Sequence, residues 1–139
     1  MGYKPEIVVI GGGWAGCAAA IVAHQVGASV TLLERTDMLL GTGLVGGIFR
    51  NNGRYTATEE LALLGNPIFK LLDKNSIHTN VEFPGHKHSS LYNVWTMEPI
   101  IRKYLEDLGI KTHFYCRITD LSIEDGAIKA VYSKDGEKE

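Results

Sequence analysis

Glycines near the N-terminus have the spacing needed to bind phosphate groups. Residues 11–16 read GGGWAG and contain the pattern Gly-x-Gly-x-x-Gly. Gly11 permits a tight turn, Gly13 has no Cβ and lets a pyrophosphate approach the backbone, and Gly16 lets a helix pack close to a strand. Free N–H groups and the dipole at a helix N-terminus attract negative charge. The residues predicted to contact the pyrophosphate of a dinucleotide are Gly11, Gly13, Trp14, Ala15 and Gly16.

A carboxylate follows at the distance that a nucleotide site requires. Glu34 stands 18 residues after Gly16 and ends a second apolar segment. It can accept hydrogen bonds from both ribose hydroxyls of an adenosine, and it would repel a 2′-phosphate, which disfavours NADP. The fingerprint and Glu34 suit FAD and NAD equally well, so they predict a dinucleotide without choosing between the two.

The elements that must position these residues are predicted from the same stretch. Ile7–Ile10 is a short β-branched run, typical of a strand buried on both faces. Ala15–Val26 is alanine-rich and predicts a helix, which Gly27 would end. Val30–Leu33 predicts a second strand. Residues 1–35 therefore predict a βαβ unit, for which the plain alternative is an ordinary crossover with a glycine-rich turn.

This pattern resembles the N-terminal FAD-binding segment of two-dinucleotide-fold flavoproteins. Residues 34–41, ERTDMLLG, are similar to the "ER…LG" stretch of the FAD-dependent oxidoreductase family related to fumarate reductase flavoproteins. Residues 41–53, GTGLVGGIFRNNG, resemble the glycine-rich loop that passes the flavin. The further cofactor-binding residues that the resemblance implies are Arg35, Gly41, Thr42, Gly43 and Ile118, the last through its backbone to the adenine.

The resemblance implies flavin-mediated hydride or electron transfer on a small-molecule substrate. It assigns no catalytic residue. Flavin disulfide reductases carry a redox cysteine pair soon after the acidic residue, whereas residues 40–45 read LGTGLV, which argues against disulfide exchange. Two alternatives stay open: an NAD-binding Rossmann domain of a dehydrogenase, and a non-catalytic accessory subunit or fragment. The position of the fingerprint, the ER…LG loop and a hairpin after the third strand favour FAD.

Residues 36–95 predict a glycine-rich loop and a helical insertion. The loop runs from Thr36 to Tyr55 and would wrap a cofactor. A capping box at residues 56–59 starts one predicted helix, which ends at Leu64, and residues 66–67 start a second helix that ends near Lys74.

Residues 76–90 are polar and are expected to be irregular, with His86 and His88 on an exposed loop. Together with His78 they suggest a metal, but only Glu82 adds a further ligand, so no metal site is predicted. Residues 91–95 could form a strand.

Residues 96–139 predict a helix, a third parallel strand and a β-hairpin. Thr96 is expected to cap the helix, with Pro99 in its first turn and Gly109 after its end. Residues 111–116 would form the strand. Segments alternating at period two flank Asp125-Gly126, a hairpin turn signal, and this piece resembles the β-meander of FAD-binding Rossmann domains.

Composition bounds the remaining possibilities. The 139 residues predict one α/β domain, a Rossmann-like FAD-binding domain that is incomplete relative to the resembled family, which continues into a substrate domain. A net charge of −2 gives no reason to expect nucleic acid, and no apolar run suggests a membrane span. Cys17 and Cys116 form no CxxC motif, which favours the cytoplasm. Expected partners are the rest of the flavoenzyme on another chain, or a second copy.

Overall fold

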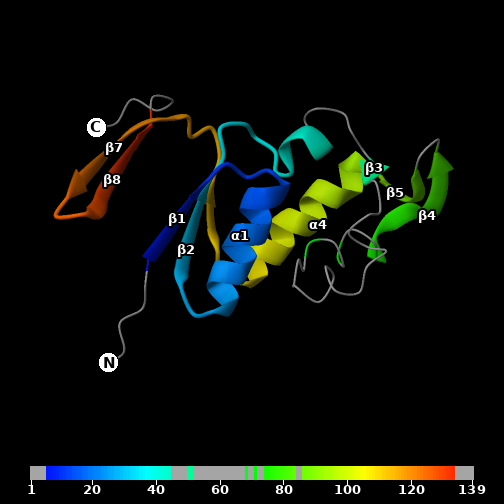
Figure 1. The fold of residues 1–139 in the computed structure, drawn as a ribbon, viewed down its shortest axis with the longest axis horizontal. Helices are drawn as coiled ribbons and strands as arrows, with labels where there is room; N and C mark the ends of the chain where they lie inside the picture. Colours follow the sequence, from blue (N-terminus) through cyan, green and yellow to red (C-terminus); the bar gives the residue numbers. More distant parts are fainter. Residues whose placement is uncertain are drawn as a thin grey trace.

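The computed structural model describes residues 6–44, 50–51, 68, 71, 74–83 and 86–133, without the side chains of 50–51, 79–83 and 86–90. The described strands form a parallel sheet of order β1-β2-β6, an antiparallel sheet of order β3-β5-β4, and the hairpin β7-β8. The antiparallel sheet and the hairpin lie at opposite ends of the molecule (Figure 1). The elements are β1 (Glu6–Ile10), α1 (Trp14–Gln25), β2 (Ser29–Leu33), the 3₁₀ helix η1 (Gly41–Gly43), β3 (Arg50–Asn51), β4 (Ser76–Phe83), β5 (His86–Tyr92), α4 (Val94–Asp107), β6 (Lys111–His113), β7 (Ile118–Glu124) and β8 (Ala127–Ser133).

The predicted βαβ unit is confirmed. β1 and β2 pair in parallel, with Ile7 opposite Val30 and Ile10 opposite Leu33. Helix α1 connects them, and its chain leaves through Gly27, whose φ of +97° is the left-handed conformation that favours glycine after a helix.

The third parallel strand is also confirmed, although it is shorter than predicted. β6 pairs with β2, and Leu32 lies opposite Thr112. The strand ends at His113 rather than Cys116, because Tyr115 takes a φ of +58° and turns the chain. After this turn the N–H of Cys116 donates to the carbonyl of Glu34 at 2.8 Å.

Helices α1 and α4 lie on the same side of the parallel sheet (Figure 1). The core between them and the sheet contains fully buried Ile21, Leu32 and Ile101. On the other face, Val8 is 48% and Ile10 54% exposed. The prediction that the first strand is buried on both faces is therefore wrong for this chain, since the described helices lie against only one face of β1.

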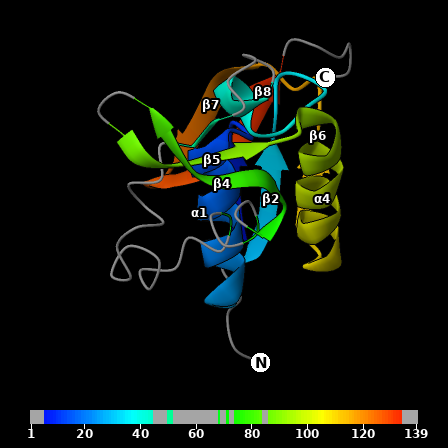
Figure 2. The same cartoon turned by 90° about the vertical axis from the view of Figure 1, so that its right-hand side faces the viewer.

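Residues 76–90 are not irregular as predicted. They contain most of an antiparallel pair, β4 and β5, which Figure 2 shows in front of the βαβ unit. His86 and His88 lie in β5 rather than on a loop, and the expected strand at residues 91–95 is only the end of β5. The pairing has register shifts along its length, so it lacks the regular alternation by which strands are recognised in a sequence.

The start of α4 also differs from the prediction. Asn93, not Thr96, is the N-cap, and its side chain accepts a hydrogen bond from the N–H of Trp95. Pro99 therefore lies in the second turn of the helix instead of the first. Both Asn and Thr are good caps, and the sequence offers them three residues apart.

The predicted hairpin is confirmed. Glu124 pairs with Ala127 at its tip. The two residues between them, Asp125 and Gly126, have φ angles of +51° and +75°, as a type I′ turn requires.

The helix predicted to end at Leu64 and the helix start predicted at residues 66–67 lie outside the described residues.

Candidate nucleotide-binding site

The glycine turn joins β1 to α1, and each of its predicted glycines has a different environment. Gly11 has a φ of +98°, and its N–H donates to the carbonyl of Leu33 at 2.7 Å. A Cβ on Gly16 would lie 1.7 Å from the carbonyl oxygen of Gly11, so only glycine lets the helix approach the turn this closely. A Cβ on Gly13 would meet nothing within 4 Å. Gly13 therefore faces open space, whereas Gly16 is needed for packing.

The N-terminus of α1 opens at this space. Its N-cap is Gly13, and among the residues that the structure describes no side chain caps the helix. The first intrahelical bond runs from the N–H of Cys17 to the carbonyl of Gly13, at 2.9 Å. The positive end of the helix dipole thus meets a glycine that leaves room for a ligand, which is the arrangement of helix-terminal phosphate sites.

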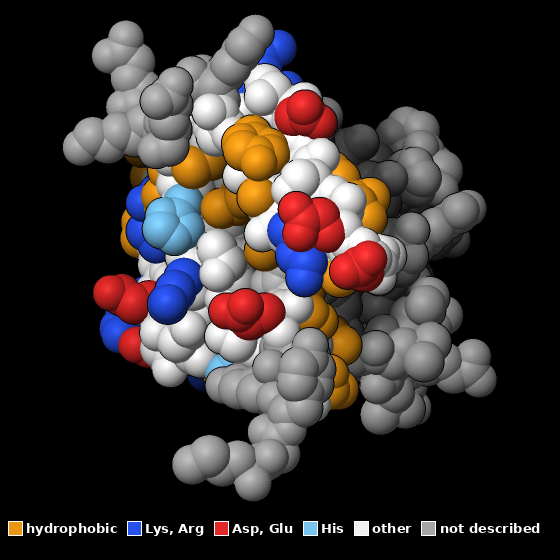
Figure 3. Space-filling model, turned by 90° about the vertical axis from the view of Figure 1, so that its left-hand side faces the viewer, with side chains coloured by type: hydrophobic (Ala, Val, Ile, Leu, Met, Phe, Trp, Pro, Cys, Tyr) orange, Lys and Arg blue, Asp and Glu red, His pale blue; other side chains and the backbone are white. Residues whose placement is uncertain are grey.

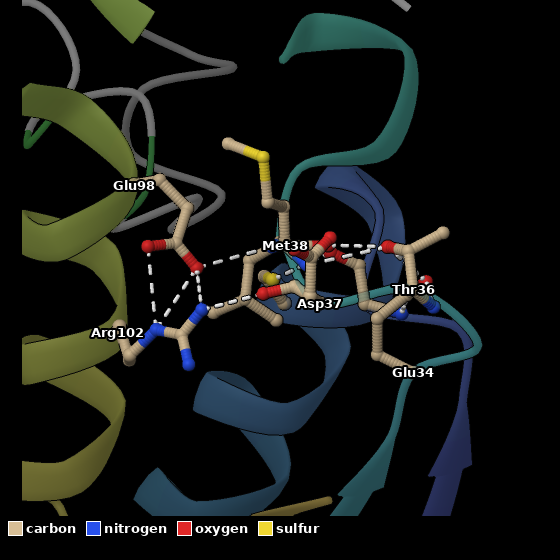
Figure 4. A network of polar contacts seen from close by, with 9 residues as sticks. Glu34, Thr36, Asp37, Met38, Glu98 and Arg102 are labelled. Carbon is tan, nitrogen blue, oxygen red and sulfur yellow. Dashed lines mark hydrogen bonds and ion pairs between the residues drawn. The ribbon is translucent and has the colours of Figure 1, made fainter. Parts of the chain in front are cut away.

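Glu34 lies at the carboxyl end of β2 and is only 6% exposed. One carboxylate oxygen, Oε2, accepts a hydrogen bond from the N–H of Gly12 at 2.7 Å. The other, Oε1, accepts from the N–H of Thr36 at 2.8 Å and from its hydroxyl at 2.9 Å. Figure 4 shows Glu34 beside Thr36 in this network. The carboxylate therefore fastens the glycine turn to the end of β2, a structural role beyond the ribose binding predicted from the sequence.

The segment after Glu34 folds back onto the same turn. The N–H of Leu40 donates to the carbonyl of Gly12 at 2.7 Å, and Leu40 forms a parallel bridge with Gly13. Leu40 has a φ of +67°, which is unusual for a bulky residue and requires support from its surroundings. Both peptide groups of Gly12 are thus bonded within the protein, and the side of the turn left open is that of Gly13.

Two further predicted residues, Gly41 and Gly43, lie close to the turn. A Cβ on Gly41 would be 3.5 Å from the Cα of Gly13. Gly43 is buried, and a Cβ there would clash with the indole of Trp14 at 2.1 Å. The Trp14 ring itself packs against Tyr92, with ring centroids 5.9 Å apart. The Trp14 side chain therefore belongs to the packing behind the site, and a phosphate would meet its backbone.

The remaining predicted residues are Ala15, Arg35, Thr42 and Ile118. Arg35, Thr42 and Ala15 are exposed. Ile118 begins β7, two residues after Cys116, which bonds to the backbone of Glu34. The contacts described above join Gly11, Gly16 and Glu34 at one turn and place Gly41 beside Gly13. A role for Arg35, Thr42 and Ile118 in cofactor binding stays a prediction.

Gly12, Glu98 and Arg102 were not among the residues predicted from the sequence. A Cβ on Gly12 would lie 2.7 Å from a methyl carbon of Leu39, so this glycine is required by packing. Glu98 and Arg102 of α4 form an ion pair that also bonds to the backbone of residues 37 and 39. Their spacing of four residues on a helix was the available signal, but it is shared by many surface pairs.

Cys17 lies beneath the turn and is fully buried. Its thiol donates to the carbonyl of Gly12 at 3.1 Å, and burial raises the pKa of the thiol from 9.0 to about 12. A thiol with such a pKa is a packed core group at neutral pH rather than a nucleophile.

Other kinds of site find no support in the described part of the chain. No group of three or more histidine, cysteine, aspartate or glutamate side chains there could hold a metal ion. None of the helices in the same residues is long and apolar enough to cross a membrane.

The fold and the glycine turn define the chain as a Rossmann-like domain of the dinucleotide-binding class. Residues 6–138 match the family described as Glucose inhibited division protein A. The chain belongs to that family. This result confirms the FAD-dependent oxidoreductase family expected from the sequence.

Solved structures share the fold at low sequence identity. GidA from Aquifex aeolicus aligns with a TM-score of 0.66 and 17% identity, over 94% of this chain and 22% of that one. FqzB aligns with a TM-score of 0.60 and 22% identity, over 97% of this chain and 34% of the other. CtdE, in a complex with FAD, aligns with a TM-score of 0.56 and 17% identity, over 93% and 37%. The chain thus spans about a third or less of the first two relatives.

Proposed function

We propose that this chain binds the adenosine diphosphate half of FAD and forms the nucleotide-binding part of an FAD-dependent oxidoreductase. The observation that carries the proposal is the open space at Gly13, which lies at the uncapped N-terminus of α1. The backbone N–H groups of the first helical turn would bind the pyrophosphate there. When bound, the flavin would supply the hydride or electron transfer.

Glu34 would bind the ribose while it continues to hold the turn. A carboxylate has about four lone-pair sites, and three donors already contact Glu34. The Thr36 hydroxyl has one hydrogen and also lies 3.0 Å from the carbonyl of Met38, to which it can donate instead. That rotation would free a second acceptor site, so both ribose hydroxyls can be accommodated without breaking the bond to Gly12.

The CtdE complex supports FAD, since a protein with this fold carries that cofactor. The test is a visible absorption spectrum of the purified chain, followed by the spectrum after mixing with FAD and desalting. A retained flavin band supports the proposal. A colourless chain that binds NADH in a fluorescence titration would replace FAD with NAD, and a chain that binds neither would favour the accessory-subunit alternative.

Variants at the turn locate the site. Gly13→Val should abolish flavin retention, because its side chain would fill the space left for the pyrophosphate. Ala19→Val is the matched control, since Ala19 is exposed farther along α1 and should tolerate the same side chain. Flavin retention by Gly13→Val would place the phosphate elsewhere.

The rest of the flavoenzyme would cover the bare face of β1 and the hairpin. Hydrophobic side chains gather among charged ones on the face shown in Figure 3. Those exposed in these elements include Val8, Ile10, Ile123 and Ile128. The longer relatives have additional chain to cover such a face.

The alternative partner is a second copy of this chain, which would form a homo-oligomer. Gel filtration tests this alternative, because a concentration-independent monomer would exclude pairing between copies.

A further inference from the structure

We propose that Glu98 and Arg102 are positioning residues for the nucleotide site, holding residues 37–40 against the glycine turn from helix α4. The expected effect on cofactor affinity rests on the proposed function. The attachment of the segment to α4 rests on the geometry alone. In the described part of the chain, the hydrogen bonds and ion pairs of both side chains go to each other and to residues 37 and 39, so both would act through the segment between them and the turn.

The pair bonds to two backbone groups of that segment. One guanidinium nitrogen of Arg102, Nη2, donates to the carbonyl of Asp37 at 2.7 Å. The Oε1 atom of Glu98 accepts from the N–H of Leu39 at 3.3 Å. The two side chains are themselves joined, since Nε of Arg102 lies 3.0 Å from the same oxygen. Figure 4 shows α4 reaching the segment through this pair.

The segment is held on its other side by the turn itself. Leu39 packs where a side chain on Gly12 would be, and Leu40 bonds to the carbonyl of Gly12. Leu40 adopts its left-handed conformation between these two attachments. Because that conformation persists only when contacts on both sides enforce it, loss of the outer attachment should let the segment leave the turn.

Arg102 has three roles in this attachment. It neutralises Glu98, whose side chain is only 8% exposed and would be costly as an unpaired charge. It bonds to Asp37, and its guanidinium lies 4.0 Å from the ring centre of Phe114, just after β6. The side chain thus links α4, the segment and the end of the third parallel strand.

Helix α4 supplies a matched control one residue along. Lys103 and Asp107 also form an ion pair at a spacing of four residues. Their side chains are 71% and 58% exposed. This pair has the same i,i+4 spacing as Glu98–Arg102, with the order of the charges reversed, so Lys103→Met removes a helical ion pair without touching the segment.

Two measurements test the proposal. The first is the FAD dissociation constant of the Arg102→Met variant, in which methionine retains much of the side-chain stem. This dissociation constant should rise about tenfold, as for the loss of a hydrogen bond to a charged group. The second is the labelling rate of Cys17 in a Cys116→Ser background, because the thiol lies beside the backbone amide of Leu40. Labelling should accelerate in Arg102→Met and remain unchanged in Lys103→Met.

A double variant separates positioning from general stability. Glu98→Gln combined with Arg102→Met should bind FAD little worse than Arg102→Met alone, since both changes remove the same attachment. The proposal is overturned if Arg102→Met changes neither the labelling rate nor the affinity of the fraction that circular dichroism shows to be folded. If the wild type binds no flavin, the proposed function fails, and the labelling rates alone decide whether the pair holds the segment.

Discussion

The glycine turn and the β7–β8 hairpin are stabilised in opposite ways. The turn is bonded to residues from β2 and from the segment after it, through Leu33, Glu34 and Leu40. The hairpin is held by its own ladder, and Ile123 and Ile128 on opposite strands are each 62% exposed. A change in the turn should therefore spread through the fold and the site, whereas a change on the hairpin surface should stay local.

The largest effect should come from Gly16→Ala. The added methyl carbon would lie 1.7 Å from the carbonyl oxygen of Gly11, a backbone atom that cannot move without opening the turn. We expect the free energy of unfolding to fall by about 3 kcal/mol or more, at the upper end of overpacking costs. Urea unfolding followed by circular dichroism measures this loss.

Gly13→Ala is the matched comparison within the same turn. Its methyl group meets no atom within 4 Å, so the free energy of unfolding should change by no more than about 1 kcal/mol. FAD affinity should nevertheless fall, because the methyl group faces the proposed phosphate position. Equal destabilisation by the two variants would show that the open space at Gly13 is not real.

Glu34→Ala should have the next largest effect, and it should appear without any cofactor. The change leaves the buried N–H of Gly12 without its acceptor, which costs about 1.5–3 kcal/mol for a hydrogen bond to a charged group. Thermal unfolding of the flavin-free chain measures it. A Glu34→Ala variant that loses flavin affinity but no stability would assign the carboxylate to the ribose alone.

Cys17 should make stability depend on pH above about 9. Its thiol has a pKa of about 12 in the fold against 9.0 for an ordinary cysteine, so the folded state holds the proton more tightly. Stability is then fully present below pH 9 and falls between pH 9 and 12, by at most about 1.4 kcal/mol per pH unit. Urea unfolding at several pH values should show a shallower decline for Cys17→Ala, and parallel curves would contradict the burial of the thiol.

Local signals were enough to predict the parts that local contacts hold. Asp125-Gly126 specifies its turn through two positive φ angles, and Gly27 ends α1 through another. The fingerprint glycines likewise predicted a turn before a helix. In each case the residue type itself restricts the backbone, so the structure follows from a few neighbouring positions.

The sequence could not predict features that depend on distant contacts. Arg102 bonds to Asp37 across a sequence separation of 65 residues, and no motif near either residue predicts this hydrogen bond. The exposure of Val8 and Ile10 also has no local cause, because their β-branched character is the same whether or not a partner covers them. The candidate site was thus predicted through its glycines and Glu34, while its support from α4 was not.

The smallest expected effect is that of Ile123→Thr in the hairpin. Threonine keeps the β-branched shape that suits a strand, and the side chain is 62% exposed, so the free energy of unfolding should change by less than about 0.5 kcal/mol. Loss of apolar area should instead reduce self-association at high concentration, measured by sedimentation velocity. Ser122→Thr, at the neighbouring position of β7, adds the same residue without removing an apolar one and serves as the control. A large loss of stability in Ile123→Thr would mean that the hairpin surface is part of the core, and the contrast with the glycine turn would disappear.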